Sequence, residues 1–215
     1  MKNKIFRKTE LTDMISVTVG YPYVEFNERD NRLVKLNNFF NAIEPDKEKQ
    51  HRLLTSFAEC LDGSDDKNTM INIGENCGKS TMMRLLRKTF GQYFREMPSM
   101  ILKDLKYVDI NHPICGFAAC EKARIVVVSA EEDVCSINRV ADITNHKKIL
   151  TYSKQFKLVI NMQTRTTIQS DTIPDNIEVF EYVGNFVKDP DMQYKIENLH
   201  QAFIWLLINK YYNKK

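Results

Sequence analysis

The chain has 215 residues, enough for one α/β domain with a small extension and a full hydrophobic core. Hydrophobic residues make up 43% of it and no apolar run approaches the length of a membrane span, so we expect a soluble globular protein with no membrane partner. The basic N-terminus is followed by no apolar segment typical of a secretion signal, which predicts an intracellular protein, in a host cell if the source is a virus. A net charge of +3 neither indicates nor excludes a nucleic-acid partner.

The cysteines are scattered, odd in number, and free of the CxxC pairs and histidine spacing typical of zinc sites. We therefore expect neither a zinc site nor a disulfide framework. Four of the five are predicted to be small buried hydrophobic residues, and the other lies in a glycine-containing loop. In chain order they are Cys60, Cys77, Cys115, Cys120 and Cys135.

The first third of the chain predicts an extended segment followed by two helices. Residues 11–28 alternate β-branched or aromatic residues with polar ones, as extended or hairpin structure does. Apolar residues then recur at helical spacing in two segments, the second opened by Pro45-Asp46 and ended by Gly63. We expect an N-terminal extension over residues 1–30, a helical lead-in over 31–66 and an ATPase domain over 67–215.

From residue 69 onward, strand patterns alternate with helix patterns. "TMINIG" predicts a strand, "ENCGKS" a turn, and "TMMRLLRKTFGQYF" a helix ending near Gly91. Three more strands are predicted at 123–133, 155–164 and 177–183, the last of them at a sheet edge. One long helix is predicted after them, at 192–212. This order predicts an α/β fold with a mainly parallel sheet, whose ligand site lies at the carboxyl ends of the strands.

The turn after the first of these strands has the composition of a phosphate-binding loop. Such a loop directs backbone N–H groups and a lysine at phosphates, and a hydroxyl at Mg²⁺. The usual spacing places its first glycine at position 73, where Ile73 stands, with a glycine one residue later. The alternative is a chance match at a helix start. The candidate nucleotide-binding residues are Gly74, Glu75, Asn76, Cys77, Gly78, Lys79, Ser80 and Thr81.

Two later strands end in side chains suited to phosphate chemistry. Glu131 and Glu132 follow an apolar strand and predict one carboxylate for Mg²⁺ and one that polarises the attacking water, the alternative being a solvated acidic turn. Asn161 ends the next strand, where its amide can orient that water, although it is also an ordinary strand-ending residue.

A basic turn lies between these two strands. It contains Asn145, His146, Lys147 and Lys148, which would contact the backbone of single-stranded DNA if they projected from a ring-shaped motor. A solvated surface hairpin accounts for the same residues.

Taken in order, these segments resemble the superfamily 3 helicases, and among them the helicase part of the primase-helicases of poxviruses and related large DNA viruses. "GENCGKSTMMRLLRKTFGQYF" resembles the family's motif A, "KARIVVVSAEED" its motif B, and "VADITNHKKILTYSKQFKLVINMQ" its basic hairpin and motif C. "FFNAIEPDKEKQHRLLTSFAECLDG" is similar to the family's helical lead-in and "FVKDPDMQYKIENLHQAFIWLLINKYY" to its C-terminal tail. The resemblance covers most of the chain.

The resemblance implies an AAA+-like P-loop domain that forms a hexameric ring and uses ATP with Mg²⁺ to move along single-stranded DNA in viral DNA replication. It would then act alone or with a larger replicative helicase or primase. By the same match Lys79 would contact the phosphates, Ser80 the metal, and Asn161 the γ-phosphate. Glu131 or Glu132 would serve the metal and the water, and the DNA-facing residues would be His146, Lys147 and Lys148.

The chain departs from the family pattern at Ile73, at Ala130 before the acidic pair, and at Asp175-Asn176, where the family usually has a finger arginine. Arg165 is a possible substitute for that arginine. These departures leave a second hypothesis open, namely a catalytically weak or inactive helicase-like module that acts through protein–protein interaction. A small-molecule kinase is a third, but the segment between "GQYF" and "KARIV" lacks the convergent arginines of a substrate lid.

Overall fold

The computed structural model describes residues 10, 12, 15–62, 69–99, 120, 122–129, 156–163, 175–182, 184 and 190–214. Its centre is a parallel sheet with the strand order β2-β3-β4-β1-β5. The strands are β1 (Thr69–Ile73), β2 (Phe94–Met97), β3 (Ile125–Ser129), β4 (Lys157–Met162) and β5 (Ile177–Glu181). The predicted α/β fold with a mainly parallel sheet is confirmed.

The inner strands explain the unbroken apolar runs of the sequence. Every residue of β1 is buried, and so are the first four residues of β3. Strands covered on both faces need apolar side chains at successive positions rather than at alternate ones. The predicted edge strand, β5, lies at one edge of the described sheet, next to β1.

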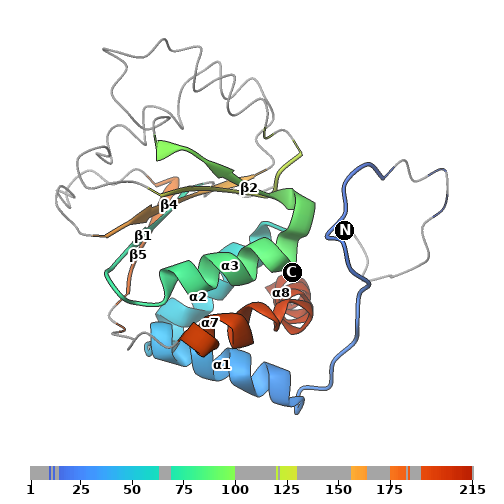
Figure 1. The fold of residues 1–215 in the computed structure, drawn as a ribbon, viewed down its shortest axis with the longest axis horizontal. Helices are drawn as coiled ribbons and strands as arrows, with labels where there is room; N and C mark the ends of the chain where they lie inside the picture. The colour runs from blue at the N-terminus through green and yellow to red at the C-terminus, as the bar shows by residue number, and fades with distance from the viewer. Residues whose placement is uncertain are drawn as a thin grey trace, which may run out of the picture.

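The described helices gather on one side of the sheet (Figure 1). The predicted helical lead-in is present as α1 (Asn31–Ile43) and α2 (Lys47–Glu59), each begun by an aspartate that accepts hydrogen bonds from the first turn. Helix α3 (Lys79–Phe90) follows β1, and α7 (Pro190–Glu197) and α8 (His200–Lys214) come last. None of the helices in the described ranges is long and apolar enough to cross a membrane.

Helix α8 lies among the other helices and completes the core beneath the sheet. It packs against α1, α2 and α3. Phe203 of α8 is fully buried and stacks on Phe40 of α1, with ring centroids 5.3 Å apart. Burying an aromatic side chain of this kind contributes about 2 kcal/mol, so the last helix is part of the fold's main hydrophobic contact.

The single long helix predicted over 192–212 is wrong, because the chain turns between α7 and α8. At the end of α7 the carbonyl of Tyr194 accepts from both the backbone N–H and the side-chain amide of Asn198, at 3.4 and 2.9 Å. Leu199 N–H then bonds three residues back to Ile196, at 3.0 Å, which closes the turn. A new helix begins at His200.

The sequence patterns did not predict β2. They allowed a hairpin over residues 11–28, and the described part of that segment contains no strand. The predicted helix ends at Phe90, and Gly91, with φ of +50°, leads through a short 3-10 turn (Gly91–Tyr93) into β2. Residues 15–19 and 22–27 form neither helix nor strand. They follow the end of α3 instead, where Thr18 and Gln92 exchange hydrogen bonds of 3.0 and 3.3 Å. Gly63, the expected end of the second helix, lies outside the described residues.

Candidate nucleotide-binding site

The loop between β1 and α3 turns sharply at the carboxyl edge of the sheet. Three of its residues have positive φ: Gly74 at 145°, Asn76 at 49° and Gly78 at 83°. Glycine reaches these conformations without strain, and asparagine tolerates the left-handed region better than most residues. Alternation of such residues with ordinary ones turns successive N–H groups toward a common centre, which is how phosphate loops bind anions.

Gly74, one residue later than the usual spacing, meets two requirements of this turn. A Cβ atom there would lie 2.9 Å from Sγ of Cys77 and 3.0 Å from the backbone oxygen of Tyr182. The second contact is with main chain, which cannot move aside as a flexible side chain can. Ile73, at the usual glycine position, is the last residue of β1, and its carbonyl accepts from the N–H of Tyr182 at 2.9 Å.

Lys79 folds back over this loop. Its Nζ donates to the backbone carbonyl oxygens of Gly74 and Met162, so it lies between the loop and the end of β4. Partial burial lowers the pKa of this amine, while the thiol of Cys77 and the carboxylate of Glu75 act in the opposite direction. The lysine is thus held at the loop by carbonyl groups, with no carboxylate bound to it among the described residues.

The start of α3 suits a phosphate group. Gly78, its N-cap, supplies no side-chain hydrogen bond, and the first turn contains no acidic residue. The first N–H groups of the helix therefore lack both a side-chain cap and a competing negative charge, and the helix dipole favours an anion there. Ser80 is exposed and Thr81 half-buried in this first turn. The residues present fit a bound phosphate with a metal at the Ser80 hydroxyl.

Parallel pairing brings Asn161 to this edge of the sheet. It lies opposite Asn72 of β1 and Ser129 of β3, one residue before the carbonyl that Lys79 contacts. Nδ2 of Asn72 donates to Oδ1 of Asn161 at 3.1 Å. The loop and Asn161, which are about eighty residues apart in sequence, are thus neighbours at the carboxyl ends of β1 and β4.

Several predicted site residues lie outside the described residues: Glu131, Glu132, His146, Lys147 and Lys148, together with Ala130, Asn145 and Arg165. Asp175 and Asn176 are described. They form the turn before β5, at the amino edge of the sheet and thus at the opposite end from the loop.

Sequence reasoning missed Asn72 and Tyr182. The hydroxyl of Tyr182 donates to Oδ1 of Asn72 at 2.8 Å, and burial raises the pKa of this phenol well above its ordinary value. Asn72 is completely buried. Its signal in the sequence was a lone amide inside the apolar strand "TMINIG", because a buried polar side chain requires partners.

Comparisons with known proteins find a relative in sequence and several structures with a similar fold. No protein-family model matches the chain. The chain is 33% identical over 218 aligned residues to a protein of Acanthamoeba polyphaga mimivirus named "Putative helicase L207/L206". The alignment takes in 94% of this chain but 23% of the mimivirus protein.

Solved structures with a similar fold include two of the apo C-terminal region of NrS-1. Both have a TM-score of 0.57, at 13% identity, and they cover 83% and 90% of this chain. The chain spans 47% and 50% of those two structures, or about half of each. The chain is therefore similar in sequence to one segment of a helicase-like viral protein, and it shares its fold with the NrS-1 C-terminal region.

Proposed function

We propose that this chain is the ATP-hydrolysing motor domain of a superfamily 3 type DNA helicase that acts in viral DNA replication. One observation carries the proposal: the loop between β1 and α3 places Lys79 between its own backbone and the end of β4, beside Asn161. The similarity to a mimivirus protein with a helicase name supports the same class of activity.

In this proposal the residues at the edge of the sheet share the work of phosphoryl transfer to water. The N–H groups of residues 74–79 and the amine of Lys79 bind and orient the β- and γ-phosphates. The amide of Asn161 positions the water that attacks the γ-phosphate. A bound Mg²⁺, held by Ser80 and Glu131, would neutralise charge on the phosphates, and Glu132 would polarise the water.

The proposed nucleic-acid partner is single-stranded DNA, contacted by His146, Lys147 and Lys148. Cationic side chains of this kind bind the phosphate backbone without reading its sequence. The proposed assembly is a hexameric ring, or association with a larger replicative helicase or primase.

A second candidate function is a helicase-like module that binds other proteins and hydrolyses ATP weakly or not at all. Ile73 favours it, because this residue is buried in β1 and provides no glycine at the usual first position of the loop. The turn at Asp175-Asn176, where a finger arginine is usual, favours it too.

The test is ATP hydrolysis by the purified chain with Mg²⁺, with and without single-stranded DNA, beside Lys79→Ala. The matched control is Lys88→Ala, which removes an exposed lysine from the other end of α3. We expect DNA to stimulate hydrolysis, Lys79→Ala to abolish it, and Lys88→Ala to leave it unchanged.

If DNA does not change the rate of hydrolysis, the chain is an ATPase but the proposal that it moves along DNA is wrong. If the folded wild-type chain hydrolyses no ATP but associates with a larger helicase, the second candidate is correct.

A further inference from the structure

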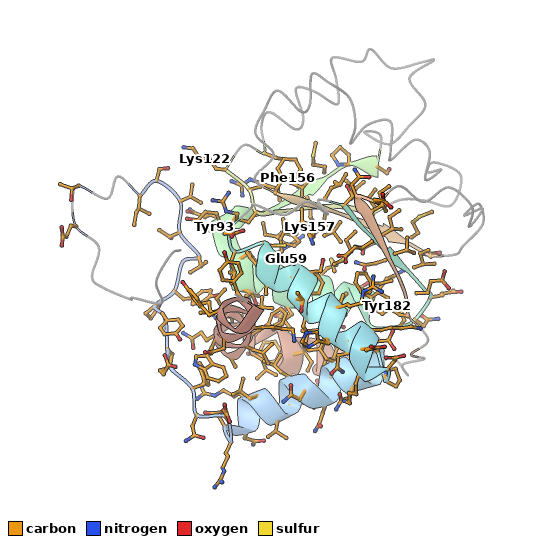
Figure 2. All side chains as sticks on the ribbon, turned by 180° about the vertical axis from the view of Figure 1, so that it is seen from behind. Glu59, Tyr93, Lys122, Phe156, Lys157 and Tyr182 are labelled. Atoms are coloured by element: carbon orange, nitrogen blue, oxygen red, sulfur yellow. The ribbon has the colours of Figure 1, made fainter. Side chains whose placement is uncertain are left out.

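Three polar side chains form a hydrogen-bonded line under the phosphate loop. Tyr182 follows β5, Asn72 lies in β1 and Asn161 in β4, so the line crosses neighbouring strands of the sheet. Figure 2 places Tyr182 at the opposite end of the sheet from Phe156 and Lys157, which lie at the amino end of β4. The line is therefore at the end of the sheet where the loop lies.

In the structure the donors and acceptors of this line run in one direction, from Tyr182 through Asn72 to Asn161. The phenol of Tyr182 donates to Oδ1 of Asn72, at 2.8 Å, so the amide nitrogen of Asn72 is the group that faces β4. That nitrogen donates to Oδ1 of Asn161 at 3.1 Å. The oxygen of Asn161 is thereby engaged, and among the described residues no partner engages its Nδ2.

We infer that Asn72 and Tyr182 are positioning residues that fix which end of the Asn161 amide faces the nucleotide. This inference rests on the proposed ATPase function. A freely rotating amide presents its oxygen as readily as its nitrogen, and an oxygen would repel a γ-phosphate. With its oxygen bonded to Asn72, Asn161 has Nδ2, a donor, left for a nucleotide.

Burial makes this orientation durable. Asn72 is 0% and Tyr182 7% exposed, so neither can exchange its partner for water. Reversing the amide of Asn72 would set its nitrogen against the phenol and its oxygen against Oδ1 of Asn161. The amide of Asn161 would then have to turn together with that of Asn72, or the hydrogen bond between the two amides would be lost.

The first test is the steady-state ATPase rate of Tyr182→Phe, which removes one oxygen atom from the line. The control is Tyr211→Phe, which removes a hydroxyl of another buried tyrosine, bonded to Asp62 far from the loop. We expect Tyr182→Phe to lower kcat about five-fold, the change in equilibrium that one lost hydrogen bond produces, with the KM for ATP unchanged. The control should keep the wild-type kcat.

Asn72→Asp is the stronger variant, because its carboxylate can only accept. Nδ2 of Asn161 would then turn toward β1 and its oxygen toward the nucleotide. We expect kcat to fall about 100-fold, as when a donor to developing charge is removed. Circular dichroism and the KM for ATP show whether the variant is folded and still binds.

A second readout does not depend on hydrolysis. The side-chain amide resonances of Asn161, identified in ¹⁵N spectra by their loss in Asn161→Asp, should shift in Tyr182→Phe and stay in place in Tyr211→Phe. Unmoved Asn161 resonances, or a kcat in Tyr182→Phe equal to that of the control, would overturn the inference. If wild type lacks ATPase activity the proposed function fails, while the resonances still decide whether Tyr182 orients Asn161.

Discussion

Replacing Lys157 by methionine tests how α2 is held to the sheet. Lys157 begins β4 with a side chain only 2% exposed, and its Nζ lies 3.4 Å from Glu59 of α2 and 3.7 Å from Glu178 of β5. It also donates to Oγ of Ser56 at 2.5 Å, and that hydroxyl donates to Glu178 at 2.7 Å. Figure 2 shows Lys157 and Glu59 close together between the sheet and α2.

The loss of stability in Lys157→Met depends on the carboxylates that no longer have Lys157 as a partner. The side chains of Glu59 and Glu178 are 18% and 10% exposed, so both carboxylates would lose a buried cation, and Glu178 would keep its contact with Arg52, 3.9 Å away. Breaking a buried ion pair from one side costs about 3–5 kcal/mol, whereas an exposed pair contributes about 0.2–1 kcal/mol. We expect Lys157→Met to lower the free energy of unfolding by about 3 kcal/mol or more.

Urea unfolding, followed by circular dichroism, measures this change. Lys49→Met, on an exposed position of the same α2, is the control and should change stability by less than about 0.5 kcal/mol. Adding Glu178→Gln to Lys157→Met removes one of the two carboxylates that lost Lys157 and should restore at least about 1 kcal/mol, a non-additivity expected of contacting groups. A loss in Lys157→Met no larger than that of the control would refute the reasoning.

Three further changes give separable outcomes. Gly74→Ala should weaken ATP binding and destabilise the fold by about 1–3 kcal/mol more than Gly20→Ala. Both glycines have positive φ, but a Cβ atom at Gly74 would meet Cys77 and backbone, whereas one at Gly20 would meet nothing within 4 Å. Equal unfolding free energies of the two variants would contradict this. Asp46→Ala should cost about 1 kcal/mol in urea unfolding because Asp46 accepts from two N–H groups of α2, and Asp46→Asn, which keeps an acceptor, should cost less. His200→Asn should flatten the pH dependence of stability: burial lowers the pKa of His200, so the unfolded chain binds its proton more readily, and wild type loses stability as pH falls below about 6.5. A melting temperature that falls equally in both proteins between pH 7.5 and 5 would exclude His200 as the source.

The strand–loop–helix unit could be predicted because its signals are local. Thr69–Ile73 is short and mostly apolar, the glycines follow at once, and the helix pattern starts directly after them. The shift of the first glycine to Gly74 was visible, but its reason was not. That reason is the backbone of Tyr182, which follows another strand and comes close only through parallel pairing with β1.

Features that depend on pairing between distant segments could not be predicted from the sequence. Asn161 was chosen for its place at the end of an apolar strand, but nothing in the sequence pairs it with Asn72. Nothing in the sequence set Lys157 apart from the rest of the predicted strand over 155–164, although it is buried among carboxylates from α2 and β5. The chain turns between α7 and α8 at the i→i−3 hydrogen bond from the N–H of Leu199 to Ile196, and apolar periodicity does not register such a change in backbone pairing.

The position of α8 has a consequence for how the chain is made. Helices α1, α2 and α3 are synthesised first, yet each packs against α8, whose Phe203 stacks on Phe40. Long-range contacts of this kind delay folding until both partners exist. During translation the faces of α1, α2 and α3 that pack against α8 therefore cannot make this contact until α8 has left the ribosome. We expect the nascent chain to need chaperone protection until then, and to acquire protease resistance only after His200–Lys214 has emerged.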